Sequence, residues 1–355
     1  MLLFDSHLDL GLNGVDWNRD LRMTVSDIRV QEITLGMTDP GRRTNTVSFP
    51  ELKRAEVGLG VATVLARQER QINHPFGYTT PEACYAVAMS HLYYYRAMER
   101  AGFMRPIRTK RDLQQHVADW KASPTDTPFG YILSMEGADP ILSPADAARW
   151  WEAGLRVVGL SHYGQGIYAG GTTATSGLTA KGFELLAAFQ ELGMVVDVTH
   201  LADEGFWQVT EKYQGNILSS HNNCRALVPG QRQFSDDQIK KLIERGTVIG
   251  AAFDSWMLHA GYVQGETDNS QVKLKNVIDH IDHICQLAGN VRHVAIGSDL
   301  DGGFGKEQSP SDLETIRDLQ KIPLLLKEKG YSQDDISGIM HGNWLRFFQH
   351  ALPAR

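Results

Sequence analysis

The chain has 355 residues, of which 42% are hydrophobic, and its 35 Lys and Arg against 42 Asp and Glu give a formal net charge of −7. This length suffices for one large domain with a substantial core, and an acidic chain without a basic run argues against nucleic-acid binding. No stretch approaches the roughly 18 apolar residues of a transmembrane helix.

The three cysteines lie far apart, which excludes both a disulfide framework and a thiolate zinc site and suits a reducing compartment. The first ten residues, MLLFDSHLDL, lack the basic region and the cleavage site of a signal peptide. We therefore expect a cytoplasmic protein.

The first predicted strand, Leu2–Phe4, runs into the sequence DSHLD. His7 and Asp9 are two residues apart, so in an extended chain they point to the same side and could chelate a cation. The pattern His-x-Asp is common by chance, and its place at a strand end is what makes it informative.

Residues from about 11 to 50 show no clear hydrophobic period and contain many polar breakers. We expect a long excursion over the active face here, either a lid or an interface arm. A short helix is predicted to start at 49, the next strand covers 57–65, and a long helix covers 80–102.

A buried strand over 130–135 ends on Glu136 and Gly137. A carboxylate at this point could bridge two metal ions, and a turn-capping glutamate is an equally weighted alternative. The strand over 157–161 ends on His162, and the segment 163–176, rich in Gly and Thr, predicts a mobile loop over the site.

Two further strands, 194–198 and 217–218, flank a predicted helix over 202–213, and each strand is followed by a histidine, His200 and His221. In a parallel barrel, adjacent strand ends lie side by side on the face where chemistry collects. A lone histidine is more often structural, but two imidazoles at matched strand ends are natural metal ligands.

The last predicted strands cover 247–253 and 293–298, and the second ends on Asp299. The helix between them, 272–288, carries His280 and His283 at a spacing that could suit a metal. We place both on a solvated helix face instead, because they lie in the middle of a helix among charged residues. A closing helix is predicted over 335–349.

Polar residues with imidazole or carboxylate groups thus follow most strands: His7, Asp9, Glu136, His162, His200, His221 and Asp299. Roughly eight strands alternating with helices predict an α/β fold, a (β/α)8 TIM barrel that forms a single domain over 1–355 with an inserted N-terminal excursion. Imidazole with carboxylate, without thiolate, suits zinc or a similar divalent ion in a hydrolytic site.

Seven motifs follow one another along the chain: DSHLDL, SMEGADP, LRVVGLSH, GLTAKGFELLAAFQELGMVVDVTH, SSHNNCR, GSDLDGG and GNWLRFF. Together they resemble the membrane (renal) dipeptidase family, the M19 metallopeptidases of the amidohydrolase superfamily. The likeness runs from residue 1 to about residue 347. It implies a zinc-dependent dipeptidase, with L-Xaa-D-Xaa dipeptides as one expected substrate class.

The resemblance implies a binuclear zinc centre with two Zn²⁺ per chain. His7 and Asp9 would hold one ion, His200 and His221 the other, and Glu136 would bridge them. A hydroxide that bridges both ions would be the nucleophile.

The resemblance also implies three roles around the metals. His162 would bind the substrate carbonyl oxygen and stabilise the oxyanion, and Asp299 would move the proton from the attacking water to the leaving amine. Arg232 would bind the terminal carboxylate of the substrate. Gln165 and Gln233 stand where the family pattern has asparagine, and both changes concern substrate selectivity rather than the metals.

Two alternatives stay open at this point. The same metal centre could cleave another amide, such as an N-acyl amino acid or a lactam, and a non-hydrolytic member of the family would use the fold differently. The expected partners are a small dipeptide or amide substrate and a second copy of the chain in a homodimer, without nucleic acid or membrane.

Overall fold

The computed structural model describes residues 1–69 and 77–354, and its centre is a parallel sheet of seven strands. Six of them follow one another around the sheet in chain order, β1 (Leu3–Leu8), β2 (Val57–Leu65), β6 (Phe129–Glu136), β7 (Leu155–Gly159), β8 (Val195–Asp197) and β9 (Ile217–Leu218). The short β5 (Met104–Pro106) pairs with β6. Two-residue strands β3 (Arg67–Gln68) and β4 (Gly77–Tyr78) pair with each other beside the sheet.

Strands β10 (Ile249–Ala251) and β11 (Val294–Ile296) complete the ring. A parallel bridge between Ser219 and Ile249 connects β9 to β10. Between β11 and β1, the Ser298 amide donates to the Asp5 carboxylate over 2.8 Å. The predicted (β/α)8 barrel is thereby confirmed. The Asp5 side chain of β1 helps to close it between the last strand and the first.

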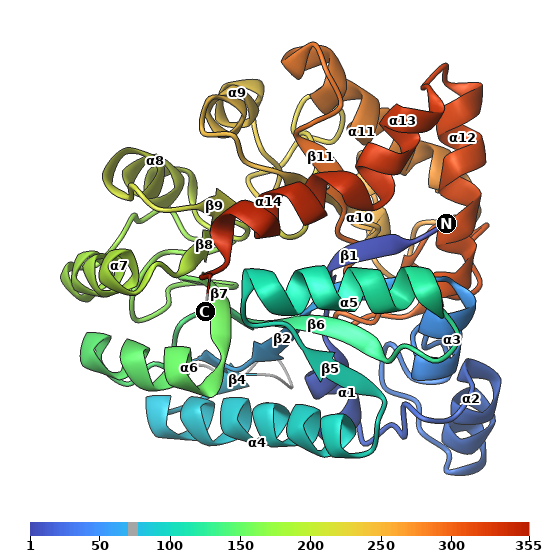
Figure 1. The fold of residues 1–355 in the computed structure, drawn as a ribbon, viewed down its shortest axis with the longest axis horizontal. Helices are drawn as coiled ribbons and strands as arrows, with labels where there is room; N and C mark the ends of the chain where they lie inside the picture. Colours follow the sequence, from blue (N-terminus) through green and yellow to red (C-terminus); the bar gives the residue numbers. More distant parts are fainter. Residues whose placement is uncertain (70–76, 355) are drawn as a thin grey trace.

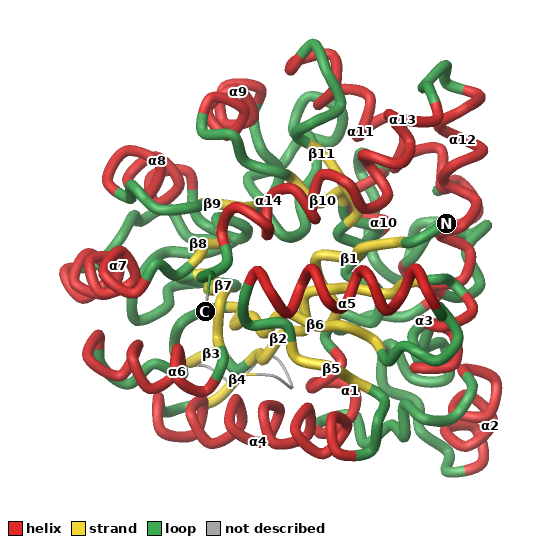
Figure 2. Tube along the Cα trace, in the orientation of Figure 1, coloured by secondary structure: helices red, strands yellow, loops and turns green. Residues whose placement is uncertain are grey.

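Helices lie around the ring of strands (Figures 1 and 2). The main ones are α4 (Pro81–Arg100), α6 (Ala147–Ala153), α7 (Ala180–Leu192), α8 (Asp203–Lys212), α9 (Asp236–Glu244), α11 (Leu274–Ala288) and α12 (Ile322–Glu328). The ends of helix α7 illustrate how local sequence signals set where a helix begins and stops. The Thr179 side chain accepts from the Gly182 amide at its start, and Gly193 ends it with φ 73°.

Helices α5 (Lys110–Ala122) and α14 (Asn343–Ala351) lie across one end of the barrel (Figure 1). Trp344 and Phe348 of α14 belong to the same buried cluster as Phe4, and the Phe4 and Phe348 rings stack with centroids 5.5 Å apart. This aromatic cluster closes the barrel at the amino-terminal ends of its strands. The cleft described below lies at their carboxyl-terminal ends.

The closing helix is divided, which corrects the prediction of one helix over 335–349. Helix α13 (Gln333–Ser337) passes through a π-helical turn (Gly338–Gly342) into α14. The Asn343 side chain donates to the carbonyl groups of Val291 and Val294, at 2.7 and 2.8 Å. These bonds hold the turn against the segment that leads into β11.

The N-terminal excursion contains two helices that its sequence period does not predict, α1 (Leu10–Val15) and α2 (Val25–Thr34), and the predicted short helix from 49 is α3 (Phe49–Arg54). In helix α2, Val25, Ile28 and Glu32 are buried, whereas Val30 and Ile33 are 59% and 57% exposed. A buried Arg19 donates to Glu32 over 2.8 Å. The buried face of α2 therefore combines two apolar residues with an ion pair. Because other apolar residues of the helix are exposed, hydrophobic periodicity does not reveal it.

The prediction for helix α11 was wrong for one of its histidines. His280 is fully buried, and its Nδ1 accepts from the Cys224 amide over 3.0 Å. His283 is partly exposed and lies 2.8 Å from Asp236. Neither contributes to a metal-binding group of the described residues.

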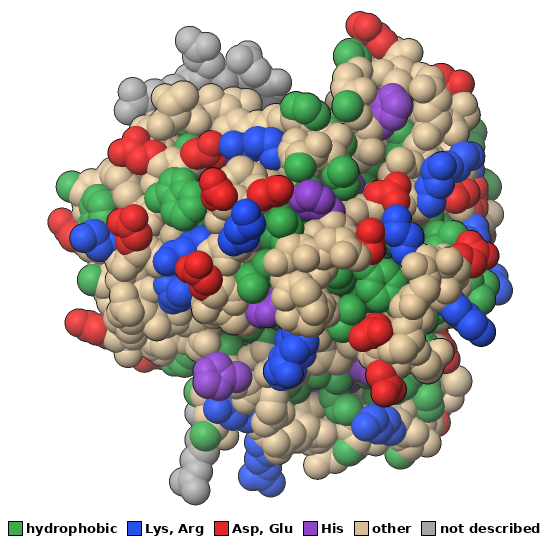
Figure 3. All heavy atoms as spheres, turned by 90° about the horizontal axis from the view of Figure 1, so that it is seen from above, with side chains coloured by type: hydrophobic (Ala, Val, Ile, Leu, Met, Phe, Trp, Pro, Cys, Tyr) green, Lys and Arg blue, Asp and Glu red, His purple; other side chains and the backbone are tan. Residues whose placement is uncertain are grey.

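No helix in the described ranges combines the length and the apolar character needed to cross a membrane. On the face shown in Figure 3, acidic and basic side chains are interspersed.

Candidate metal centre

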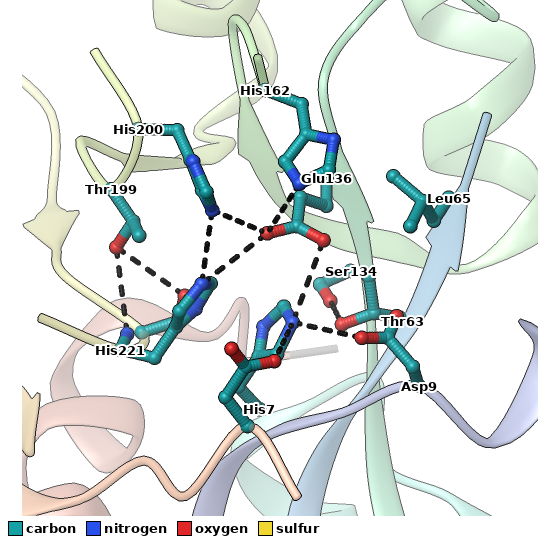
Figure 4. Close-up of polar contacts among 12 residues, drawn as sticks. His7, Asp9, Thr63, Leu65, Ser134, Glu136, His162, Thr199, His200 and His221 are labelled. Carbon is teal, nitrogen blue, oxygen red and sulfur yellow. Dashed lines mark hydrogen bonds and ion pairs between the residues drawn. The ribbon is translucent and has the colours of Figure 1, made fainter. Parts of the chain in front are cut away.

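The barrel brings all the predicted strand-end residues together (Figure 4). Their ligand atoms form three overlapping groups, and within each group these atoms lie within 4.8 Å of one another. The groups are His7 with His221 and Asp299, Glu136 with His162 and His200, and His7 with Asp9 and Glu136.

Glu136, the last residue of β6, lies between the histidines of these groups. Its Oε1 lies 3.1 Å from His200 Nε2 and 3.4 Å from His221 Nε2, whereas its Oε2 lies 3.6 Å from His7 Nε2. The two carboxylate oxygens thus face different histidines, which is the arrangement that a carboxylate bridging two ions would need.

The ends of β8 and β9 are tied together beneath the two histidines. Asp197 Oδ1 accepts from the amides of Thr199 and Ser220, over 3.0 and 3.1 Å. This carboxylate fixes the two strand ends side by side, so His200 and His221 project from neighbouring points.

Hydroxyl groups orient both imidazole rings. The Thr172 Oγ1 lies 2.9 Å from His200 Nδ1, and the Ser220 Oγ lies 2.9 Å from His221 Nδ1. Each ring therefore turns its Nε2 towards Glu136, as outer hydrogen-bond partners do for histidines that bind metals.

His7 and Asp9 confirm the expectation that they point to one side, since His7 Nε2 lies 3.3 Å from Asp9 Oδ2. Strand β1 extends to Leu8, so His7 lies within the strand, which is longer than the predicted Leu2–Phe4. His7 Nε2 and Asp9 Oδ1 are buried without a hydrogen-bond partner. Buried polar atoms without partners are costly, and a cation at this point would satisfy both.

Two of these residues have strained backbones. His200 has φ 67° and Asp299 has φ 60°, in the left-handed region that residues other than glycine seldom adopt. Such conformations cluster at functional sites, where the surrounding structure maintains them.

Burial and charge set the protonation tendencies of the cluster. Burial lowers the pKa of His200 and of His221, and the charge of Arg232 acts in the same direction. Burial also disfavours a charged His7, but the carboxylates of Glu136 and Asp9 outweigh it and raise the pKa of His7.

Burial also raises the pKa of Glu136 and of Asp299. The fold thus holds several carboxylates together away from water, which is costly unless positive charge accompanies them. Imidazole nitrogens and carboxylate oxygens are a donor set that suits zinc and similar divalent ions.

His162 lies beside this cluster, with its Nε2 4.0 Å from Glu136 Oε1. The segment that follows His162, predicted as a mobile loop, contains hydrogen bonds between its own residues. The Thr172 amide donates to the His162 carbonyl over 2.8 Å. Single β-bridges join Tyr163 to Thr172 and Gln165 to Gly170.

Arg232, in the loop after β9, is 5% exposed, and its Nη2 lies 3.4 Å from His200 Nε2. Its Nη2 donates to the His221 carbonyl over 3.0 Å, while its Nε and Nη1 are buried without hydrogen-bond partners. Gln165 lines the cleft and accepts from Ser176, whereas Gln233 is buried and donates to the Met257 carbonyl over 2.7 Å.

The candidate site opens into a cleft of about 2160 Å³. Glu136, His162, His200, His221, Arg232 and Asp299 line it. The excursion contributes Asp16, Trp17, Asp39 and Arg42, so the prediction that it extends over the active face is confirmed.

Among the charged residues that line the cleft, sequence reasoning missed two that closely follow barrel strands, Arg67 and Asp254. Arg67 follows the end of β2 by two residues, and Asp254 follows β10 by three. The other site residues were predicted because they follow the carboxyl ends of strands. Looking for charged residues after every strand would also have identified Arg67 and Asp254.

The model of the membrane dipeptidase family (peptidase family M19) matches residues 1–354. Among curated proteins, the chain is 28% identical over 242 residues to an uncharacterized protein in the pqqA 5' region of Klebsiella pneumoniae, which covers 66% of this chain and 86% of that protein. It is 30% identical over 223 residues to dipeptidase aclJ of Aspergillus oryzae, over 61% of this chain and 50% of that one.

The matched stretch thus spans about half the length of that dipeptidase. Among solved structures, a metallopeptidase from Rhodobacter sphaeroides, liganded with a phosphinate mimic of the dipeptide L-Ala-D-Ala, superposes with a TM-score of 0.79 at 22% identity. The superposition covers 99% of both chains, so the two share a fold over their whole length.

Proposed function

The chain belongs to the membrane dipeptidase family of metallopeptidases, and from this premise we propose that it is a zinc-dependent dipeptidase with two metal ions per chain. The observation that carries the proposal is the division of the Glu136 carboxylate. One oxygen faces His200 and His221, and the other faces His7.

In this proposal His7 and Asp9 hold one ion, His200 and His221 hold the other, and Glu136 is shared. His7 Nε2 and Asp9 Oδ1, which are buried without hydrogen-bond partners, support the first pair. The orientation of the His200 and His221 rings by hydroxyl groups supports the second. Bound zinc would supply Lewis acidity and bring the pKa of a bound water down to about 7.

Asp299 is our candidate for proton transfer. Its Oδ1 lies 3.7 Å from His7 Nε2, and it lines the cleft. Burial raises its pKa, which favours a carboxyl group that can both accept and return a proton. We assign to it the proton that leaves the attacking water and reaches the departing amine.

His162 and Arg232 would orient the substrate. His162 Nε2 is close enough to the cluster to donate to a carbonyl oxygen placed beside Glu136. Arg232 offers two buried nitrogens without hydrogen-bond partners, Nε and Nη1, and either can donate to a terminal carboxylate. A D-residue at the carboxyl end of the substrate belongs to this proposal, since the similar fold from Rhodobacter sphaeroides carries a mimic of L-Ala-D-Ala.

The test combines the hydrolysis of a panel of L,L- and L,D-dipeptides with metal analysis of wild type and Asp299→Asn. We expect chelator-sensitive hydrolysis by the wild type. The variant should retain its zinc and lose about 10²- to 10⁴-fold in kcat, the usual range for a lost general acid or base. Hydrolysis that survives complete removal of metal would refute the proposal.

Another amide is the second candidate for the substrate, and two observations favour testing it. The cleft of about 2160 Å³ exceeds the roughly 300–1000 Å³ of most small-molecule sites. Gln165 also replaces an expected asparagine on the cleft wall. A panel of N-acyl amino acids and lactams, run beside the dipeptides, decides between the two. The cytoplasmic location and the homodimer stay predictions.

A further inference from the structure

We propose that Arg67 is a positioning residue that fixes the proton of His162 on Nε2 and aims that N–H into the cleft. This inference rests on the proposed function for its catalytic consequence, because the N–H would donate to the carbonyl oxygen of the scissile amide. Its structural part concerns only the two side chains.

The contact is direct and buried. Arg67 Nη1 lies 3.3 Å from His162 Nδ1, and the Arg67 side chain is 7% exposed. The guanidinium also lies 5.5 Å from the centroid of the Tyr163 ring and donates to Glu69 over 3.3 Å. Arg67 is thus surrounded by an imidazole, an aromatic face and a carboxylate.

The chemistry of the pair determines the tautomer. A guanidinium has N–H donors and no acceptor, and it stays protonated in proteins. His162 Nδ1 must therefore be the acceptor in this contact. In the neutral ring the proton is then on Nε2, the atom that lies 4.0 Å from Glu136 Oε1.

One buried carboxylate aligns the two segments that carry the pair. Asp139 follows β6, and its Oδ2 accepts from the Gln68 amide over 2.8 Å while its Oδ1 accepts from the Ile167 amide over 2.9 Å. Gln68 is the neighbour of Arg67, and Ile167 lies in the loop after His162. The spacing between guanidinium and imidazole is therefore built into the backbone.

The backbone of His162 is held equally closely. A Cβ at Gly171 would lie 1.9 Å from the His162 carbonyl oxygen, so this position admits only glycine. With the main chain fixed, the remaining freedom of His162 is the rotation of its ring and the choice of tautomer, and Arg67 restricts both.

The test compares Arg67→Met with Arg67→Lys in the zinc-loaded protein. Nitrogen-15 NMR of histidine-labelled protein, with His162→Gln to assign the signal, reads the tautomer directly. We expect Nε2–H in the wild type and a mixed or shifted signal in Arg67→Met. On a cleaved dipeptide, kcat should fall about 10- to 100-fold with KM within about threefold, since an oxyanion donor contributes about 10²- to 10³-fold. Arg67→Lys should recover part of both changes.

Lys181→Met is the matched control, because Lys181 is an exposed cation that lines the same cleft. It should leave the His162 signal unchanged. A wild-type tautomer in Arg67→Met, a rise confined to KM, or a fall in kcat without a change at His162 would each overturn the proposal. If the wild type cleaves no dipeptide, the proposed function fails, and the NMR comparison still decides the role of Arg67.

Discussion

The Nε2 atoms of His200 and His221 lie 3.1 Å apart, and both lie within hydrogen-bond distance of one oxygen of Glu136. Burial lowers the pKa of each ring, so both favour the neutral form, whose nitrogen lone pair can bind a metal. Three electron-rich atoms from three strands therefore converge on one point.

This convergence predicts the metal content of a variant. His221→Ala should lower bound zinc from about two ions per chain to about one or fewer, because a tetrahedral site tolerates the loss of a ligand poorly. Mass spectrometry of the purified protein measures this. His283→Ala is the control, since His283 pairs with Asp236 outside the cluster, and it should keep the wild-type zinc content. Full zinc in His221→Ala would contradict the assignment.

Arg232 should be the residue that makes hydrolysis depend on a free C-terminal carboxylate of the substrate. Arg232→Met is expected to raise KM for a dipeptide about 10- to 100-fold, since a charge-assisted hydrogen bond contributes about 1.5–3 kcal/mol. The rate ratio between a dipeptide and its C-terminal amide should collapse in the same variant. Arg225→Met provides the comparison, because the Arg225 guanidinium is bound to Asp203 at 2.7 and 2.9 Å, and it should keep that ratio.

The ion pair in the excursion should control stability. Burial favours a neutral Glu32, but hydrogen bonds and charge from Arg19 outweigh it and hold the pKa of Glu32 below its ordinary value. Glu32→Gln should lower the free energy of unfolding at pH 7 by at most about 3–5 kcal/mol, because the buried Arg19 then keeps Asp301, 3.9 Å away, as its acidic partner.

The pH dependence of that difference follows from the lowered pKa. The stabilisation by ionised Glu32 is present above its unfolded value of 4.5 and is lost as the pH falls through the folded value. Urea unfolding of wild type and variant from pH 7 down to pH 3 should show the two curves approaching each other. Asp20→Asn, which removes an exposed pair with Arg22, should change stability by less than about 1 kcal/mol.

For Asp254 we expect the pH dependence of the free energy of unfolding to have the opposite sign from that of Glu32. Burial raises its pKa to about 7, although the Gln308 amide donates to both of its oxygens over 2.8 and 2.9 Å. The folded state therefore holds this proton up to about pH 7, while the unfolded chain releases it near 3.8. The contribution of Asp254 to stability falls as the pH rises through this window.

Asp254→Asn removes that ionisation, so its stability relative to wild type should increase between about pH 4 and pH 7. The slope is at most about 1.4 kcal/mol per pH unit for one proton. Urea unfolding across the window measures it, and Asp334→Asn, at an exposed position, should run parallel to wild type. A pH-independent difference for Asp254→Asn would show that its carboxyl group ionises normally.

The sequence by itself determined where most strands run and which polar residues follow them. Apolar runs that stop at His162 or Asp299 are local signals, since a barrel strand is buried along its length and its carboxyl end opens on the cleft. The cap at Thr179 and the stop at Gly193 likewise act within one helix.

Only the tertiary structure decided which groups face each other. The division of the Glu136 oxygens, the burial of Glu32 against Arg19 and the contact of Arg67 with His162 each depend on where separate segments meet. A local pattern reports which side of an element is apolar, but a buried ion pair or a guanidinium beside an imidazole is stable only when the partner is in place. Those partners come from distant parts of the chain, and folding brings them together.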